Sequence, residues 1–299
     1  MTVIIGLGIV IAAVFISYLA GDGHLWALYQ PTEILLILGA AVGALVIATS
    51  RRSLRLLRLG LAGIFKRGIY DKALYMDLMS CMYLILSSAK REGLRAVESH
   101  IENPAESAIF SQYANIIKNK RVMEFLIDYM RLMISGNMSS LELETLMDEE
   151  LETVRETDAL PVHALRTMAD GLPAFGIVAA VMGVIKALAA VDQPPSVLAE
   201  LISKALVGTF AGVLFAYGVG FPFADALERR NSEAIKALEC VKVTLLAYVN
   251  GYPPQIAVEF GRKVLFNTVR PSFVELEEHV RSTRHSGAGA GAGAQSSGK

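Results

Sequence analysis

Four stretches of the chain are apolar over about 20 residues each, the length that a helix needs to cross the hydrocarbon layer of a membrane. They cover about residues 2–20, 34–50, 172–191 and 205–224. The first stretch lacks the basic start and the small-residue cleavage site of a signal peptide, so we expect it to be a retained helix. Burial of these stretches in a water-soluble core is the alternative, and four runs of this length argue against it.

The segments between the apolar stretches have the spacing of amphipathic helices. Residues 71–88 and 121–136 each place their apolar side chains on one broad helix face. Residues 139–156 are similar but acidic, and Ser139 and Glu142 have the spacing of a capping box, which predicts the start of a helix. The final residues 286–299 are a low-complexity run of Gly, Ala and Ser, which is typical of a flexible tail.

These patterns predict an all-α integral membrane protein with four transmembrane helices in two hairpins and a helical cytoplasmic domain. Its expected parts are a hairpin at 1–50, a cytoplasmic helical domain at 51–170, a second hairpin at 171–225, a cytoplasmic helical segment at 226–285 and the tail at 286–299.

The distribution of basic residues predicts which side of the membrane each part faces. The loop between the first two stretches holds Asp22 and Glu33 but no Lys or Arg. Basic residues follow the second and fourth stretches: Arg51, Arg52, Arg55, Arg58, Lys66, Arg67, Arg229 and Arg230. We therefore expect both termini in the cytoplasm and the two short loops outside.

The sequence offers no catalytic or cofactor-binding motif. It contains no GxxxxGK[ST] nucleotide loop, its five His residues lack metal-ligand spacing, and its two Cys residues form no CxxC pair. We therefore expect neither an enzyme nor a bound cofactor or metal, and no nucleic-acid partner. The four stretches also lack a carboxylate at mid-depth, where a proton relay would need one. If ions cross here, a partner subunit must supply the titrating group.

The third and fourth stretches contain small residues and one aliphatic hydroxyl. Gly208 and Gly212 form a GxxxG pair, and Gly176 and Gly183 are seven residues apart on one face. Such faces let membrane helices approach closely. Thr209 lies deep in the fourth stretch, and chemistry alone favours a hydrogen bond from its hydroxyl to its own helix.

Two prolines flank these stretches. Pro173 lies near the expected cytoplasmic start of the third stretch and Pro222 near the cytoplasmic end of the fourth. Because proline breaks a helix, both could be terminators. Their shared depth on neighbouring stretches favours a hinge layer instead, and the residues alone leave the two interpretations open.

The chain resembles the MotA family of flagellar stator subunits, a branch of the MotA/TolQ/ExbB proton-channel superfamily. The resemblance rests on long collinear blocks, above all residues 169–188, 205–227 and 241–263, and it fails only in the Gly/Ala-rich tail. It implies a ring, of five such chains, around two MotB chains in the bacterial inner membrane. A MotB aspartate would carry the proton, MotB would be anchored to peptidoglycan, and the ring would turn the rotor protein FliG.

The resemblance also implies roles for single residues. Pro173 and Pro222 match the two prolines that couple ion flow to movement, and Thr209 matches the position that faces the MotB aspartate. Relatives that use sodium carry a threonine where this chain has Ala180, so protons are the expected ion and sodium is less favoured.

The same resemblance places the rotor contact on charged residues of the 51–170 domain. Glu98 matches the family's glutamate, but the family's arginine is replaced by Lys90, with Arg91 beside it. Lysine keeps the charge and loses the bidentate fork. Glu150 is a further candidate, and a solvated charged face is the alternative for all four residues.

A related alternative is a TolQ/ExbB-like transducer, which uses proton flow for envelope processes. Those relatives have three spans and an external N-terminus, so four spans with both termini inside argue against this alternative.

Overall fold

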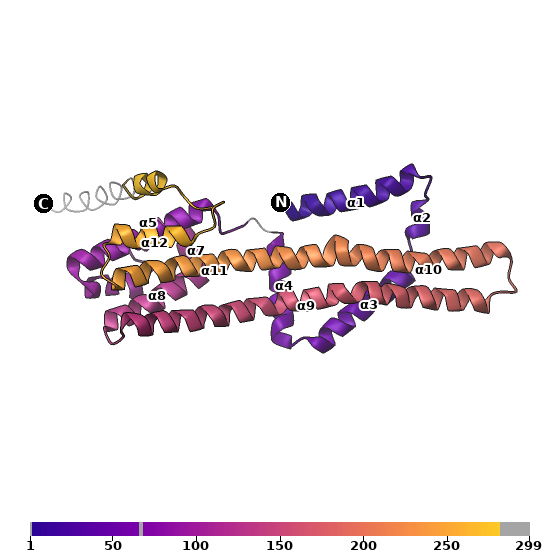
Figure 1. Ribbon diagram of the computed structural model, residues 1–299, viewed down its shortest axis with the longest axis horizontal. Helices are drawn as coiled ribbons and strands as arrows, with labels where there is room; N and C mark the ends of the chain where they lie inside the picture. The colour runs from indigo at the N-terminus through magenta and orange to yellow at the C-terminus, as the bar shows by residue number, and fades with distance from the viewer. Residues whose placement is uncertain (1, 66–67, 282–299) are drawn as a thin grey trace. The chain divides into compact units, whose positions relative to one another are not determined.

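The computed structural model describes residues 2–65 and 68–281 of the chain (Figure 1). Throughout these residues the regular structure is helical, with no strand. Lys66, Arg67, the boundary expected at 285 and the tail expected at 286–299 lie outside the described residues.

The helices follow one another in a simple order along the chain. The first group is α1 (Thr2–Ala20), α2 (Leu25–Leu28), α3 (Pro31–Ala48) and α4 (Arg51–Ile64). A group with several short helices follows: α5 (Lys72–Glu92), η1 (Leu94–Val97), α6 (Glu98–Glu102), η2 (Phe110–Gln112), α7 (Ala114–Lys118) and α8 (Lys120–Ser135). The last group is α9 (Ser140–Ala189), α10 (Pro195–Phe215), η3 (Ala216–Gly220), α11 (Phe221–Val249), α12 (Pro254–Val264) and a final helix at residues 273–281.

Four of these helical runs are long and apolar enough to cross a membrane: Thr2–Ala20, Leu25–Ala48, Ser140–Ala189 and Pro195–Val249. This confirms the four expected transmembrane helices and the all-α fold class. Within the second run, the long helix α3 begins at Pro31 rather than near 34, because proline is well placed in the first turn of a helix.

The described chain forms two compact units, each assembled from two separate stretches. Of the described residues, the membrane unit combines 2–65 with 156–231, and the polar unit combines 68–155 with 232–281. This division differs from the consecutive domains expected from the sequence. Residues 51–65 and 156–170, which the sequence places with the cytoplasmic domain, group with the membrane helices.

Two helices are longer than the apolar pattern indicates. The acidic segment at 139–156 and the third span are one continuous helix, α9, of 50 residues. Its start is the expected capping box: the Ser139 N–H donates to Glu142 Oε2 at 2.8 Å, and the Glu142 N–H donates to Ser139 Oγ at 3.2 Å. The fourth span likewise continues without a break into α11.

The polar unit has one large apolar core. α5, α8 and α12 and the parts of α9 and α11 that belong to this unit contribute to it. Asp71 caps α5 by accepting a hydrogen bond from the Leu74 N–H at 2.9 Å, and Gly93, with φ +91°, ends the same helix. Tyr75 and Tyr129 are fully buried in this core. The Tyr75 hydroxyl donates to the Glu233 carbonyl, and the Tyr129 hydroxyl lies 3.2 Å from the Leu146 carbonyl and 2.7 Å from Glu150 Oε2, to which it donates.

Candidate functional site

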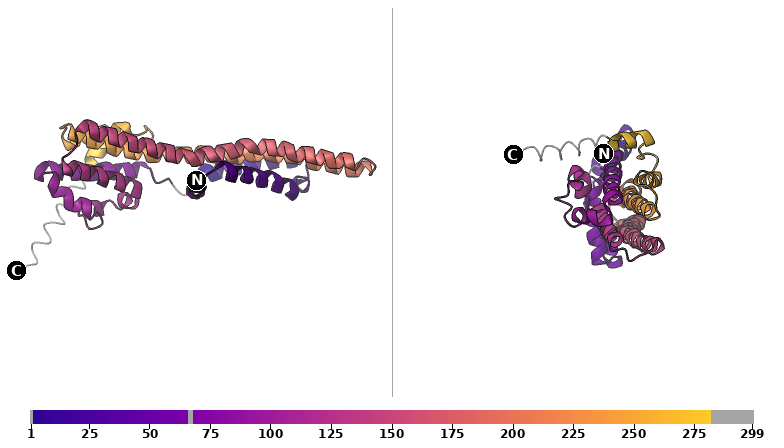
Figure 2. Two further views of the ribbon diagram at one scale, coloured as in Figure 1. Left: turned by 90° about the horizontal axis from the view of Figure 1, so that it is seen from below. Right: turned by 90° about the vertical axis from the view of Figure 1, so that its left-hand side faces the viewer.

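Small residues form the contact between α9 and α10 in the membrane unit, where the two helices lie side by side (Figure 1, Figure 2). A Cβ added to Gly176 would lie 2.9 Å from the Gly208 carbonyl oxygen, and one added to Gly212 would lie 2.7 Å from the Leu172 carbonyl oxygen. Further along, a Cβ on Gly183 would lie 2.5 Å from the Cβ of Ala205. The expected close approach of the two helices is therefore a contact between spans of the same chain.

Ala180 and Thr209 lie at this contact. A Cβ on Gly208 would be 3.5 Å from the backbone nitrogen of Ala180, and one on Gly176 would be 3.3 Å from the Cα of Thr209. The expected bond from Thr209 to its own helix is wrong: within residues 2–65 and 68–281 no hydrogen bond joins its hydroxyl to a carbonyl of α10. Thr145 and Thr244, by contrast, donate to the carbonyl four residues earlier at 2.9 and 2.8 Å. The half-buried Thr209 hydroxyl therefore retains its donor for another partner.

Neither proline of the proposed hinge ends a helix. Pro173 lies inside α9, as does Pro161, which the sequence analysis did not single out. Pro222 is the second residue of α11, which follows η3 directly, so the helical run from Pro195 to Val249 is unbroken. The terminator interpretation is therefore wrong. Each proline lacks the N–H that a continuing helix would use, which leaves a weak point within a long helix.

The two prolines also lie at different depths, which corrects the expected shared layer. The Leu172 carbonyl faces Gly212, whereas a Cβ added to Gly220 would lie 2.7 Å from the Cβ of Ala169. Pro222 lies two residues beyond Gly220, which places it at the level of about residue 167 of the antiparallel α9. Pro173 is about six residues further along α9, so at 1.5 Å per residue the two prolines are about 9 Å apart along the helix axis.

A π-helical turn, η3, occupies Ala216–Gly220 between Thr209 and Pro222. At its entry the Ala216 N–H is shared between the carbonyls of Gly212 and Val213. Single π turns inside α-helices are rare and are frequent at functional sites. Sequence reasoning missed this turn. No residue pattern at this position indicates it.

Charged residues of the membrane helices lie toward their ends. Lys186 is in the last turn of α9, and Glu200 and Lys204 of α10 form an ion pair of 2.7 Å before the apolar stretch begins. Glu33 lies in the first turn of α3 and is buried, at 6% exposure, although the sequence places it in a loop. Within the apolar stretches 2–20, 34–50, 172–191 and 205–224, the described chain holds no carboxylate.

The predicted rotor-contact residues lie in the polar unit. Lys90 and Arg91 occupy the last turn of α5, and Glu98 opens α6 after the short η1 helix; all three are exposed. The structure gives Lys90 no ion pair within the described residues, and Arg91 contacts only its neighbour Glu92, at 3.4 Å. The fourth candidate, Glu150 on α9, accepts a hydrogen bond of 2.7 Å from Tyr129. Its carboxylate is therefore fixed by its own unit, unlike the amine of Lys90.

The polar unit also contains the two cysteines, and neither has the setting of a reactive thiol. Both are buried and unpaired, and burial raises the pKa of the Cys81 thiol and raises that of Cys240 to about 12. Within the described part of the chain, no cluster of His, Cys, Asp and Glu could hold a metal ion.

Fold and site together define the class: an all-helical membrane protein whose spans pack through small residues and hold no titrating group at mid-depth. Comparison with known families agrees with this class. The MotA/TolQ/ExbB proton channel family matches residues 117–240, and the motility protein A N-terminal family matches residues 4–93. The chain belongs to the motility protein A family.

A curated relative supports this assignment, and solved structures share the fold. The chain is 46% identical to motility protein A of Salmonella typhimurium, over 95% of this chain and 97% of that protein. Its fold is similar to C. jejuni MotAB, with a TM-score of 0.76 at 20% identity over 89% of this chain and 96% of that one. It is also similar to the flagellar MotAB stator complex from Bacillus subtilis, with a TM-score of 0.68 at 24% identity over 86% and 92% of the two chains.

Proposed function

We propose that this chain is the proton-conducting subunit of a bacterial flagellar stator, which acts with MotB to convert the proton motive force into torque. Family membership supports this function. The structural observation that carries it is the α9–α10 contact: a tightly packed pair of spans that presents a hydroxyl at mid-depth and no carboxylate. A partner helix with an acidic residue would complete the ion path.

In this proposal the chain's own residues position that acidic group and respond to it. The Thr209 hydroxyl, free of its own helix, donates to the partner's carboxylate. Protonation removes that carboxylate's charge and weakens the hydrogen bond, because a bond to an ionised acceptor is roughly twice as strong as a neutral one. Pro173 and the π turn both lie on the side of this level toward Ala169, and they let α9 and α10 bend as the bond is made and lost.

The ion is proposed to be the proton. Ala180 ends in a methyl group and offers no oxygen at the contact, whereas a sodium ion requires several oxygen ligands. The chain acts as neither an enzyme nor a cofactor carrier in this account. It works in the inner membrane, with both termini in the cytoplasm, as one of five copies around two MotB chains.

The rotor contact is proposed to lie on Lys90, Arg91 and Glu98, with FliG as the partner. The unpaired amine of Lys90 supports this assignment. Glu150 is the weaker candidate, since its carboxylate is already bound to Tyr129.

A TolQ/ExbB-like transducer for envelope processes is the second candidate, because the proton-channel family model covers both groups. The match of residues 4–93 to the motility protein A N-terminal family favours the stator.

The test is complementation of a strain that lacks its own MotA, with this chain and its cognate MotB. Restored swimming is expected. A chain that inserts and co-purifies with its partner, yet restores no swimming, would move the envelope transducer to first place.

A further inference from the structure

The helix α4 lies directly after the second membrane span and crosses α9 and α11 instead of running along them (Figure 1). α3 ends at Ala48 and α4 starts at Arg51, so only Thr49 and Ser50 separate the two helices. Two extended residues reach at most about 7 Å. The start of α4 is therefore held at the membrane boundary where the second span ends.

One face of α4 packs against the other helices of the membrane unit. Leu57 and Ile64 are buried in a cluster with Val162 and Leu165 of α9 and Leu227 of α11. This face is closed to any further partner, so only the opposite face of α4 is available for binding.

Both ends of α4 are fixed by hydrogen bonds. At its start the Ser53 N–H donates to the Ser50 hydroxyl at 3.1 Å, and at its end Arg230 donates to the Gly63 carbonyl. The positive charge of Arg230 also suits the C-terminal end of a helix dipole. α4 therefore presents its free face in one fixed orientation.

That free face carries four exposed arginines, Arg51, Arg52, Arg55 and Arg58, which we call the arginine row. At about 100° per residue, Arg51, Arg55 and Arg58 lie within about 60° of one another around the helix, and Arg52 lies at their edge. Within residues 2–65 and 68–281, none of the four takes part in an ion pair or hydrogen bond. The sequence also holds no Asp or Glu from 34 to 70.

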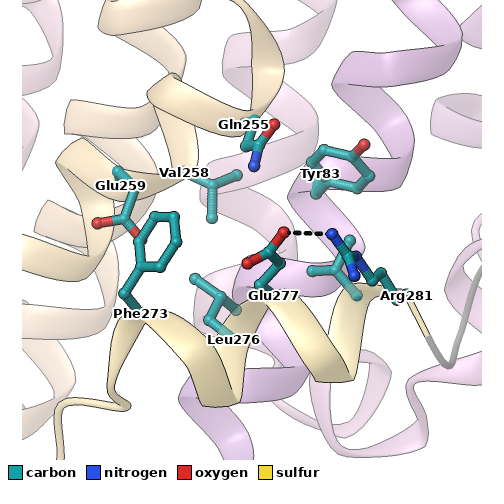
Figure 3. Close-up of a pocket in the computed structure, with 9 residues that line it drawn as sticks. Tyr83, Gln255, Val258, Glu259, Phe273, Leu276, Glu277 and Arg281 are labelled. Carbon is teal, nitrogen blue, oxygen red and sulfur yellow. Dashed lines mark hydrogen bonds and ion pairs between the residues drawn. The ribbon is translucent and has the colours of Figure 1, made fainter.

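Other arginines of the chain have their charge matched by an acidic neighbour. Arg281 donates to Glu277 at 2.7 Å in the polar unit (Figure 3). In the membrane unit Arg166 donates to both Asp225 and Glu228 at 2.7 Å. The arginine row, by contrast, has an unmatched positive charge that calls for an anionic partner from outside the chain.

An exposed apolar side chain stands among these arginines. Leu59 is 62% exposed and lies between Arg55 and Arg52 around the helix. A helix beside a span that mixes basic and exposed apolar residues is typical of the headgroup layer, where arginine meets lipid phosphate and leucine meets acyl chains. A soluble anion would match the arginines but leave Leu59 in water.

We propose that the arginine row of α4 binds the phosphate groups of anionic phospholipids in the leaflet where the second span ends. The planar guanidinium groups suit bidentate contact with phosphate. Because α4 packs against α9 and α11, lipids bound to it also hold these two helices at a fixed depth in the membrane. The contact is separate from ion conduction and rotor binding and rests on neither.

The first test is a lipid titration of the purified complex with MotB, followed by native mass spectrometry. The unaltered chain is expected to bind phosphatidylglycerol more tightly than phosphatidylcholine. The double variant Arg55→Gln with Arg58→Gln should weaken phosphatidylglycerol binding by about fivefold for each charge removed and leave phosphatidylcholine binding unchanged.

Two control variants separate charge at this face from charge in general. Arg55→Lys with Arg58→Lys keeps the charge and should retain most of the affinity. Lys118→Gln with Lys120→Gln removes two exposed charges from the polar unit and should change nothing. Equal affinity of the unaltered chain for both lipids, or undiminished phosphatidylglycerol binding by the Arg→Gln variant, would overturn the proposal.

A second measurement uses only the unaltered chain. Its unfolding temperature should be higher in nanodiscs of phosphatidylcholine and phosphatidylglycerol in equal parts than in phosphatidylcholine alone. The difference should shrink as salt is added, because exposed charges are screened. Inorganic phosphate in neutral nanodiscs should give no such rise, and a rise with phosphate alone would replace the lipid by a soluble anion. Neither measurement uses motility, so both are independent of the stator function.

Discussion

At the scale of single residues, the packing of α9 against α10 depends on glycines, which have no side chain. Gly176 and Gly212 face each other so closely that a Cβ on Gly212 would lie 3.0 Å from the Cα of Gly176. Backbone atoms of two helices cannot move aside as a flexible side chain can. The close approach of α9 and α10 therefore requires glycine at these positions. This close approach places Thr209 and Ala180 at the contact.

Gly212→Ala is expected to destabilise the helix pair by about 1–3 kcal/mol, the usual cost of overpacking, and to reduce motility. Gly43→Ala on α3 is the matched control, because no atom lies within 4 Å of its added Cβ. Thermal unfolding of the purified complex measures both. Equal unfolding temperatures for the two variants would contradict the close packing.

Pro173→Ala is expected to abolish swimming while the complex with MotB still assembles. Alanine restores the N–H that donates to the carbonyl four residues earlier. The straight helical conformation of α9 is therefore stabilised by about 1–3 kcal/mol, which opposes bending at this position. Pro161→Ala repeats the same change elsewhere in α9 and should leave swimming intact. Swimming speed and co-purification decide the matter, and a motile Pro173→Ala strain would remove the proline from the mechanism.

At the scale of helices, local signals in the sequence predict where helices start and which faces pack. They do not predict features that depend on tertiary contacts. The capping box of Ser139 and Glu142 and the small-residue face of α9 are both confirmed. The continuity of α9 through Pro173 was not predicted, since proline is a helix breaker unless neighbouring helices hold the chain. The π turn at Ala216–Gly220 was missed because no residue pattern demands it.

The final helix at residues 273–281 is held by groups whose charge depends on pH. Glu275 accepts hydrogen bonds from Lys72 at 2.7 Å and from the Ser272 N–H at 2.7 Å. These bonds, that of Lys72 first, lower the pKa of Glu275 to about 2. A carboxyl whose pKa is lowered in the folded chain stabilises it above the unfolded pKa, about 4.3, and that contribution is lost as the pH falls toward 2.

The unfolding temperature of the purified complex is therefore expected to fall between pH 4.5 and pH 2.5 more steeply for the unaltered chain than for Glu275→Gln. At neutral pH the unaltered chain should be the more stable of the two, because the amide cannot form the ion pair with Lys72. Parallel pH profiles for the two proteins would show that this pair does not hold the final helix.

At the scale of the whole molecule, the sequence predicted the class better than the division into units. Runs of apolar residues suffice to predict four spans, because crossing a membrane is a demand on length and polarity alone. The grouping of residues 51–65 and 156–170 with the membrane helices depends on contacts between distant segments, such as the hydrogen bond from Asn231 to the Asp158 carbonyl at 2.8 Å.

The central claim is that this chain turns a motor with protons through a contact that offers no ligand for sodium. The most direct measurement is the swimming speed of a strain that depends on this chain and its MotB, while sodium and the proton gradient are varied separately. The account predicts that speed collapses with a proton ionophore and is indifferent to sodium. A speed that follows sodium and survives the ionophore would contradict it.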